Sequence, residues 1–203
     1  MGTKERVLDA ALTSFGTRGF EATSLDALAG ELGVRKQTIL YYFPSKDALL
    51  AGVIDASADE LTSELERTLD RAGEGWGRVE AVVRKVFRLA ARRPALLGLL
   101  REVSRLGPPA SAQLAVRLDP LVKRAHAFLQ EEMDAGRLRP RDPSLVLLAA
   151  YSMVVGVSTE VEVLGALGSE QTLRALVRRR NALLSLLADA LVVAPPTSDV
   201  RRT

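Results

Sequence analysis

The chain has 203 residues, and its 28 Lys or Arg against 25 Asp or Glu give a formal net charge of +3. The absence of cysteine excludes disulfides, thiolate catalysis and cysteine-ligated zinc, and suits a reducing cytoplasm. Leucine and alanine dominate, aromatic residues make up 4%, and no segment alternates at period two, so we expect an all-α protein. Residues 1–6 lead into an amphipathic segment rather than a continuous apolar signal, which favours a cytoplasmic location.

Two amphipathic segments open the chain. Apolar residues recur at one-turn spacing over residues 4–18, and Gly19 then provides a C-terminal stop. A second apolar stripe begins at Leu25, and either Thr23 or Ser24 is its expected N-cap. The pattern predicts a longer first helix followed by a short second one.

The next segment, residues 33–46, has an unusual charge pattern. It holds three cations and no acid, together with two adjacent tyrosines, a glutamine and a threonine. Its apolar residues give it an inward side, and Gly33 joins it to the preceding helix, which predicts a helix-turn-helix unit. Cations and hydroxyl donors on the outward side suit DNA phosphates. Residues 1–50 carry six cations and six acids, so this inference depends on the local patch rather than on the charge of the domain.

A set of motifs at nearly gap-free spacing covers residues 4–50: Ala10-Ala11, Phe15, GFEATS at 19–24, Leu28-Ala29 and the run 33–49. In these motifs the chain resembles the tetracycline-repressor (TetR) family of bacterial transcriptional regulators. It departs from the usual pattern on the DNA-facing side. Leu40 stands where the family often has tyrosine, and Tyr42 stands where histidine is common. Arg35 and Gln37 replace a frequent serine and glycine. Because these four residues face the DNA, the departures bear on which operator sequence is recognised rather than on DNA binding itself.

Candidate DNA contacts follow from the side-chain chemistry and from the resemblance. Arginine and lysine can contact guanine, glutamine can contact adenine, and leucine can touch a thymine methyl. The candidate base contacts are Arg35, Lys36, Gln37 and Leu40. The candidate phosphate contacts, which the resemblance implies, are Thr23, Thr38, Tyr41, Tyr42 and Lys46. Two alternatives stay open: Tyr42 as a packing residue whose hydroxyl reaches water, and Lys36 as a solvated surface lysine.

Glycines and prolines divide the rest of the chain into six further helices, near 46–69, 76–93, 94–106, 110–135, 144–167 and 169–193. We therefore expect about nine helices, as the resemblance implies. They would form a helix-turn-helix DNA-binding domain (1–47), a larger helical regulatory and dimerisation domain (48–194) and a flexible tail (195–203). Residues 143–159 are uncharged and near the length of a membrane span, but serines, a tyrosine and a glycine interrupt them. A buried or interface helix is expected there, with no membrane partner.

Two roles are expected of the larger domain. In the TetR family the last two long helices pair with those of a second subunit, so a homodimer is implied. The candidate interface residues are Leu148, Ser152, Gly156, Leu176, Leu183 and Leu187. The alternative is that these leucines pack inside one subunit. The candidate ligand-pocket residues are Phe87, Leu97, Leu100, Arg101, Ser104, Phe128, Tyr151 and Val155. The alternative for each is an ordinary core position.

The sequence thus predicts a ligand-responsive, site-specific DNA-binding regulator. As a repressor, it would bind a palindromic operator in double-stranded DNA as a dimer, and an unknown small hydrophobic effector would release it. An alternative is a DNA-bound scaffold whose helical bundle binds a protein partner. No catalytic residue, metal or cofactor is predicted. One histidine, no cysteine and no Gly-rich phosphate loop leave no recognisable triad or metal cluster.

Overall fold

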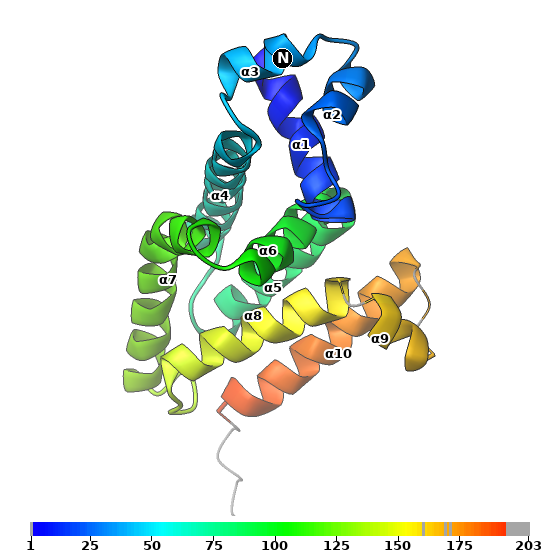
Figure 1. The fold of residues 1–203 in the computed structure, drawn as a ribbon. Helices are drawn as coiled ribbons and strands as arrows, with labels where there is room; N and C mark the ends of the chain where they lie inside the picture. Colours follow the sequence, from blue (N-terminus) through cyan, green and yellow to red (C-terminus); the bar gives the residue numbers. More distant parts are fainter. Residues whose placement is uncertain (1, 160, 169, 171, 194–203) are drawn as a thin grey trace, which may run out of the picture.

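A computed structural model of the chain describes residues 2–159, 161–168, 170 and 172–193 (Figure 1). In this part all the named secondary-structure elements are helices, and β-pairing is limited to one isolated bridge between Leu138 and Val192. The all-α prediction is confirmed. The tail predicted at 195–203 lies outside the described residues. Within them, no helix is long and apolar enough to cross a membrane.

Three helices form the N-terminal domain: α1 (Thr3–Arg18), α2 (Leu25–Leu32) and α3 (Lys36–Tyr42). They pack around Phe15, Leu28 and Ile39, whose exposed fractions are 0%. Ser24, and not Thr23, caps α2, because its side chain accepts a hydrogen bond from the N–H of Ala27. Gly33 ends α2 in the left-handed conformation, with φ at +66°. This lets the chain turn sharply into α3. The predicted helix-turn-helix arrangement is confirmed.

The remaining helices are α4 (Lys46–Arg71), α5 (Gly75–Arg92), α6 (Pro94–Leu106), α7 (Ala110–Asp134), α8 (Pro143–Thr159), α9 (Val161–Ala166) and α10 (Leu173–Leu191). The segment predicted as one helix near 144–167 is described as α8 and α9, on either side of residue 160, which lies outside the described residues. The described part holds ten helices where about nine were expected.

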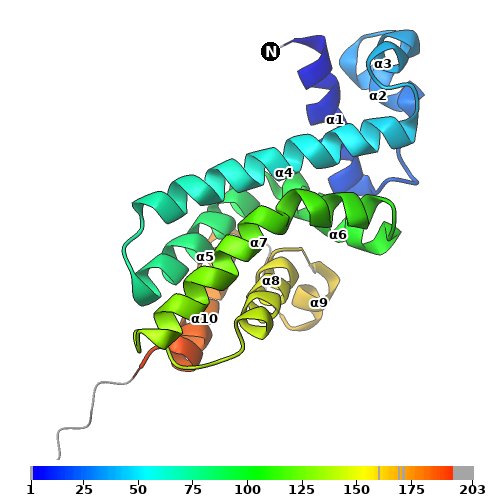
Figure 2. The same ribbon diagram turned by 90° about the vertical axis from the view of Figure 1, so that its left-hand side faces the viewer.

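Helix α4 runs without a break from the N-terminal domain along the bundle (Figure 2). Its start is fixed by Ser45, whose side chain accepts a hydrogen bond from the N–H of Ala48. On its solvent side α4 is tied to α7 by polar contacts that include Gln113–Asp55, Arg117–Asp59 and Arg124–Asp70. The expected division at residue 47 therefore lies inside the first turn of a continuous helix.

The N-terminal domain also rests on the bundle through a close crossing of α1 and α6. A Cβ atom placed on Gly98 would lie 2.0 Å from the carbonyl oxygen of Gly16. Only glycine at both positions allows the two backbones to touch. One turn further along α6, the Glu102 carboxylate accepts a hydrogen bond of 2.7 Å from the backbone N–H of Phe20. The two domains are thus joined by α4 on one side and by the α1–α6 crossing on the other.

Candidate nucleic-acid interface and ligand cavity

The outward face of α3 carries polar side chains that the other described residues do not cover. Tyr41 is 82% exposed, and its ring meets that of Tyr42 edge-on with 5.1 Å between centroids. Arg35 and Gln37 are also exposed. In the part of the chain that the structure describes, neither of these two side chains makes a hydrogen bond or ion pair. Their guanidinium and amide groups therefore remain available to a ligand.

Two lysines of the same segment are held by protein groups. Lys36 pairs with Asp26 of α2, with 2.8 Å between its Nζ and the Oδ2 atom. Lys46 lies 4.2 Å from the centroid of the Phe20 ring, and its Nζ donates to the carbonyl oxygen of Glu21 at 3.4 Å. Both side chains remain partly exposed. An anion can therefore contact either one, although at Lys36 it would compete with Asp26.

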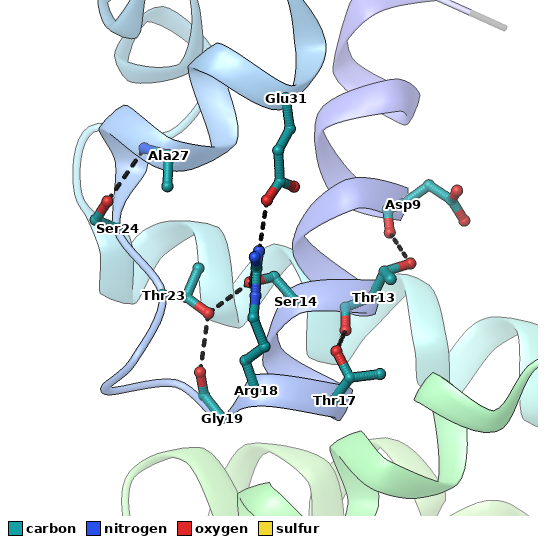
Figure 3. A network of polar contacts seen from close by, with 10 residues as sticks. All are labelled: Asp9, Thr13, Ser14, Thr17, Arg18, Gly19, Thr23, Ser24, Ala27 and Glu31. Carbon is teal, nitrogen blue, oxygen red and sulfur yellow. Dashed lines mark hydrogen bonds and ion pairs between the residues drawn. The ribbon is translucent and has the colours of Figure 1, made fainter.

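Thr23 has a different place from the one expected. Its side chain is buried, its hydroxyl lies 2.9 Å from the carbonyl oxygen of Gly19, and a second hydrogen bond of 2.6 Å joins it to the Ser14 hydroxyl (Figure 3). The hydroxyl fastens the α1–α2 connection to α1, and this replaces the phosphate contact expected of it. Thr38 and Leu40 are half-buried, at the edge of the exposed face of α3.

An apolar cavity of about 290 Å³ lies between α4, α5, α6, α7 and α8. Five of the eight residues expected in a pocket line it: Leu97, Leu100, Phe128, Tyr151 and Val155. Nearly all other lining residues are leucine, valine or alanine, and Arg78 supplies the one charged side chain among the described lining residues. Val122 of α7 and Tyr151 of α8 are 52% and 45% exposed, so the cavity opens to solvent between these two helices.

Three residues expected in the pocket lie elsewhere. Phe87 is buried in a cluster with Val83 and Val154 and does not line the cavity. Arg101 and Ser104 are exposed, toward the C-terminal end of α6 and outside the cavity lining. Conversely, the wall formed by α4 was not anticipated; it consists of Leu61, Leu65 and Leu69. Their one-turn spacing was visible in the sequence, but the same spacing is typical of an ordinary core.

The residues expected at a dimer interface divide into two groups. Leu183 and Leu187 are only 3% and 5% exposed, because they pack against the Val83 and Phe87 cluster of the same chain. They are therefore core residues, and Leu176 packs partly against the same cluster. Leu148 is 60% exposed and Ser152 is exposed. Among the described residues, no atom beyond the neighbouring residues and the backbone of α8 itself lies within 4 Å of where a Cβ of Gly156 would stand. Helices α8 and α10, which lie side by side in Figure 1, both carry further exposed apolar residues: Leu145, Leu173, Val177 and Leu186.

Comparisons with known proteins agree with this geometry. The sequence model of bacterial regulatory proteins of the tetR family matches residues 7–53. The HTH-type transcriptional regulator RutR of Escherichia coli (strain K12) is 28% identical over 164 residues, which is 73% of this chain and 70% of that protein.

Two solved structures share the fold. AibR in complex with isovaleryl coenzyme A and operator DNA has a TM-score of 0.76 at 17% identity, covering 90% of this chain and 96% of that one. The transcriptional regulator FadR from Bacillus subtilis in complex with stearoyl-CoA has a TM-score of 0.72 at 19% identity, covering 92% and 98%. RutR and FadR are transcriptional regulators rather than enzymes. A transcriptional regulator is also the class of protein that the sequence predicts.

Proposed function

We propose that this chain, a transcriptional regulator that belongs to the tetR family of bacterial regulatory proteins, represses transcription by binding an inverted-repeat operator as a homodimer. A small hydrophobic effector would release it. One observation carries the proposal: the same chain combines the exposed polar face of α3 with an apolar cavity. Two of the cavity walls, α4 and α6, pack directly against α1.

The DNA contacts are assigned by exposure and chemistry. Arg35 and Gln37 have free donors and acceptors that match guanine and adenine edges, and the partly buried Leu40 suits a thymine methyl. Lys36 would add a base contact by exchanging Asp26 for a guanine acceptor. The groups assigned to phosphates are the side chains of Thr38, Tyr41, Tyr42 and Lys46.

A dimer is proposed because one helix-turn-helix unit reads few base pairs, and two units related by a twofold axis read two half-sites. The surface proposed for it is the exposed side of α8 and α10, where Leu148 and Ser152 stand beside the open flank of Gly156. Leu186 on α10 offers further exposed apolar area. Burying such side chains between subunits is favourable by about 25 cal/mol for each Å² removed from water.

The cavity favours an effector whose buried part is an apolar chain or ring, because its walls offer carbon and almost no hydrogen-bonding groups. The acyl groups bound by AibR and FadR have this character. A pocket surrounded by five helices suits a small molecule better than a protein partner, which needs an open apolar groove. Any polar group of the effector would remain at the mouth, between Val122 and Tyr151.

Selection of random DNA duplexes by the purified protein tests the proposal. We expect an enriched inverted repeat for the natural chain, and its loss in an Arg35→Ala/Gln37→Ala/Tyr41→Ala variant, whose changes fall on exposed side chains. An Arg141→Ala variant, altered on an exposed loop before α8, should select the same motif. Binding without an enriched motif, or an enriched single half-site, would contradict the operator or the dimer respectively.

A further inference from the structure

A second hollow, of about 330 Å³, lies between α4 and α5. It is lined by four cationic side chains, Arg67 and Arg71 of α4 with Lys85 and Arg88 of α5, and by one acid, Glu64. We call it the basic cleft. The apolar cavity uses other faces of the same helices, through residues such as Leu65 and Val82. The residues of α4 that line the basic cleft belong to the C-terminal half of the helix. This half lies away from the end of α4 that adjoins α3 (Figure 2).

The cations of the basic cleft are only partly balanced within the protein. Glu64 forms ion pairs with both Arg67 and Lys85, so one carboxylate faces two cations. Hydrogen bonding from Lys85, opposed by burial, lowers the pKa of Glu64 and keeps it ionised. In the part of the chain that the structure describes, Arg71 and Arg88 have no carboxylate within ion-pair distance. Four cations against one acid leave an excess of three positive charges around a small hollow.

The spacing of these cations makes their accumulation unfavourable for the isolated helices. Arg67 and Arg71 are one turn apart on α4, and Lys85 and Arg88 are one turn apart on α5. Like charges at these spacings repel and destabilise a helix. Arg71 lies in the last turn of α4, where the helix dipole favours a cation, but Arg88 lies inside α5 and has no such compensation. An anion between the two helices would relieve the repulsion in both pairs.

We infer that the basic cleft is a second ligand site, which binds a small anion carrying two or more phosphate groups. Guanidinium groups present paired N–H donors that match phosphate oxygens, and their charge is permanent. Glu64 holds Arg67 and Lys85 in place, while Arg71 and Arg88 keep their donors for the ligand. A bound polyphosphate would bridge α5 and α4, the helix that continues into the N-terminal domain. This site is separate from the proposed effector cavity.

The test is calorimetric titration of the full chain with inorganic tripolyphosphate at constant ionic strength, so that general screening stays fixed. We expect saturable binding of one anion per chain. Because two arginine–phosphate contacts are lost, an Arg71→Ala/Arg88→Ala variant should bind at least about tenfold more weakly. The matched control is Arg84→Ala/Arg92→Ala. It removes the same charge from α5 outside the cleft lining and should stay within about twofold of the natural chain.

Several outcomes would overturn the assignment. Equal weakening in both double variants would mean that diffuse charge, and not the basic cleft, attracts the anion. Absence of saturable binding to the natural chain would also reject it, provided that circular dichroism shows a folded protein. Displacement of tripolyphosphate by a random DNA duplex would make the cleft a DNA surface. Operator affinity is measured in a separate experiment. If the proposed repressor function failed that test, the result of the tripolyphosphate titration would still stand.

Discussion

Glu102 shows how much of the junction between the two domains depends on single side chains. It lies on α6, is 9% exposed, and accepts hydrogen bonds from the backbone N–H of Phe20 and from Arg105. Glu132 has the same kind of role at the other end of the bundle, where it accepts from the N–H of Gly75 and from Arg137. Each buried carboxylate thus ties a connecting segment to a helix.

A Glu102→Gln substitution should lower the free energy of unfolding by about 1–2 kcal/mol near neutral pH, because the charge-assisted hydrogen bonds are weakened. The hydrogen bond from Arg105, with that from Phe20, lowers the pKa of Glu102 below its ordinary 4.5, against burial. A lowered pKa in the folded state contributes stability that is present above the unfolded-state pKa and lost as pH falls through the folded-state value. The free energy of unfolding, measured with urea, should therefore differ less between the natural chain and Glu102→Gln below pH 4.5 than near neutral pH.

Glu80→Gln is the matched control for this prediction. Glu80 pairs with Arg84 on the same helix, α5, and both side chains are about one-third exposed. Exposed pairs of this kind contribute little, so the change should stay within about 0.5 kcal/mol. If the difference in unfolding free energy between the natural chain and Glu102→Gln stays constant on acidification, the lost stability does not come from the charge of the carboxylate but from altered packing of the side chain.

At the scale of elements, the crossing of α1 and α6 permits almost no change. Gly98→Ala would place a methyl group 2.0 Å from the backbone oxygen of Gly16, so the helices must separate. Overpacking against backbone should cost about 1–3 kcal/mol, measured as a lower urea midpoint with an unchanged slope. Gly30→Ala, in α2 with no atom near the new methyl, should instead stabilise by about 0.5–1 kcal/mol. Equal changes in stability for Gly98→Ala and Gly30→Ala would contradict a close backbone contact between α1 and α6 at Gly98.

Elements defined by local patterns could be predicted from the sequence, and contacts between distant segments could not. The stripe from Leu25 and the stop at Gly33 gave α2 and its turn, since both signals are local. The Gly16–Gly98 crossing joins segments far apart in the chain, and no periodicity marks it. For the same reason the leucines of α10 could not be divided into those that face their own core, such as Leu183, and those that remain exposed, such as Leu186.

The candidate site divides in the same way. The exposed face of α3 follows from residues within one short segment, so its donors were predictable. Thr23 was misplaced because its hydroxyl has two partners, Ser14 and the Gly19 carbonyl, and only the folded loop brings them together. The cavity needs five helices, and the sequence identified parts of three of its walls through Leu97, Phe128 and Tyr151.

At the scale of the whole molecule, the cavity and the DNA-binding face share two supports. Helix α4 lines the cavity and continues to the turn after α3, and α6 lines it through Leu97 and Leu100 while crossing α1 at Gly98. An effector can shift the arrangement of the two domains only by its difference in affinity for the bound and released forms. Since α4 and α6 both reach the N-terminal domain, a ligand that changes their separation would change the position of α3.

Filling the cavity should therefore abolish the response and leave DNA binding intact. Ala150 of α8 lines the cavity, and Ala150→Phe would occupy its space. Free fatty acids of graded chain length are the probes, because they carry no phosphate group that the basic cleft would bind. At about a hundredfold over its Kd, a bound fatty acid should raise the unfolding free energy of the natural chain by about 2.7 kcal/mol and its Tm by roughly 5–10 °C, and release the operator. Ala150→Phe should show neither effect, while Ala127→Phe, on an exposed position of α7, should respond normally. An Ala150→Phe variant that still releases DNA would place the effector outside this cavity.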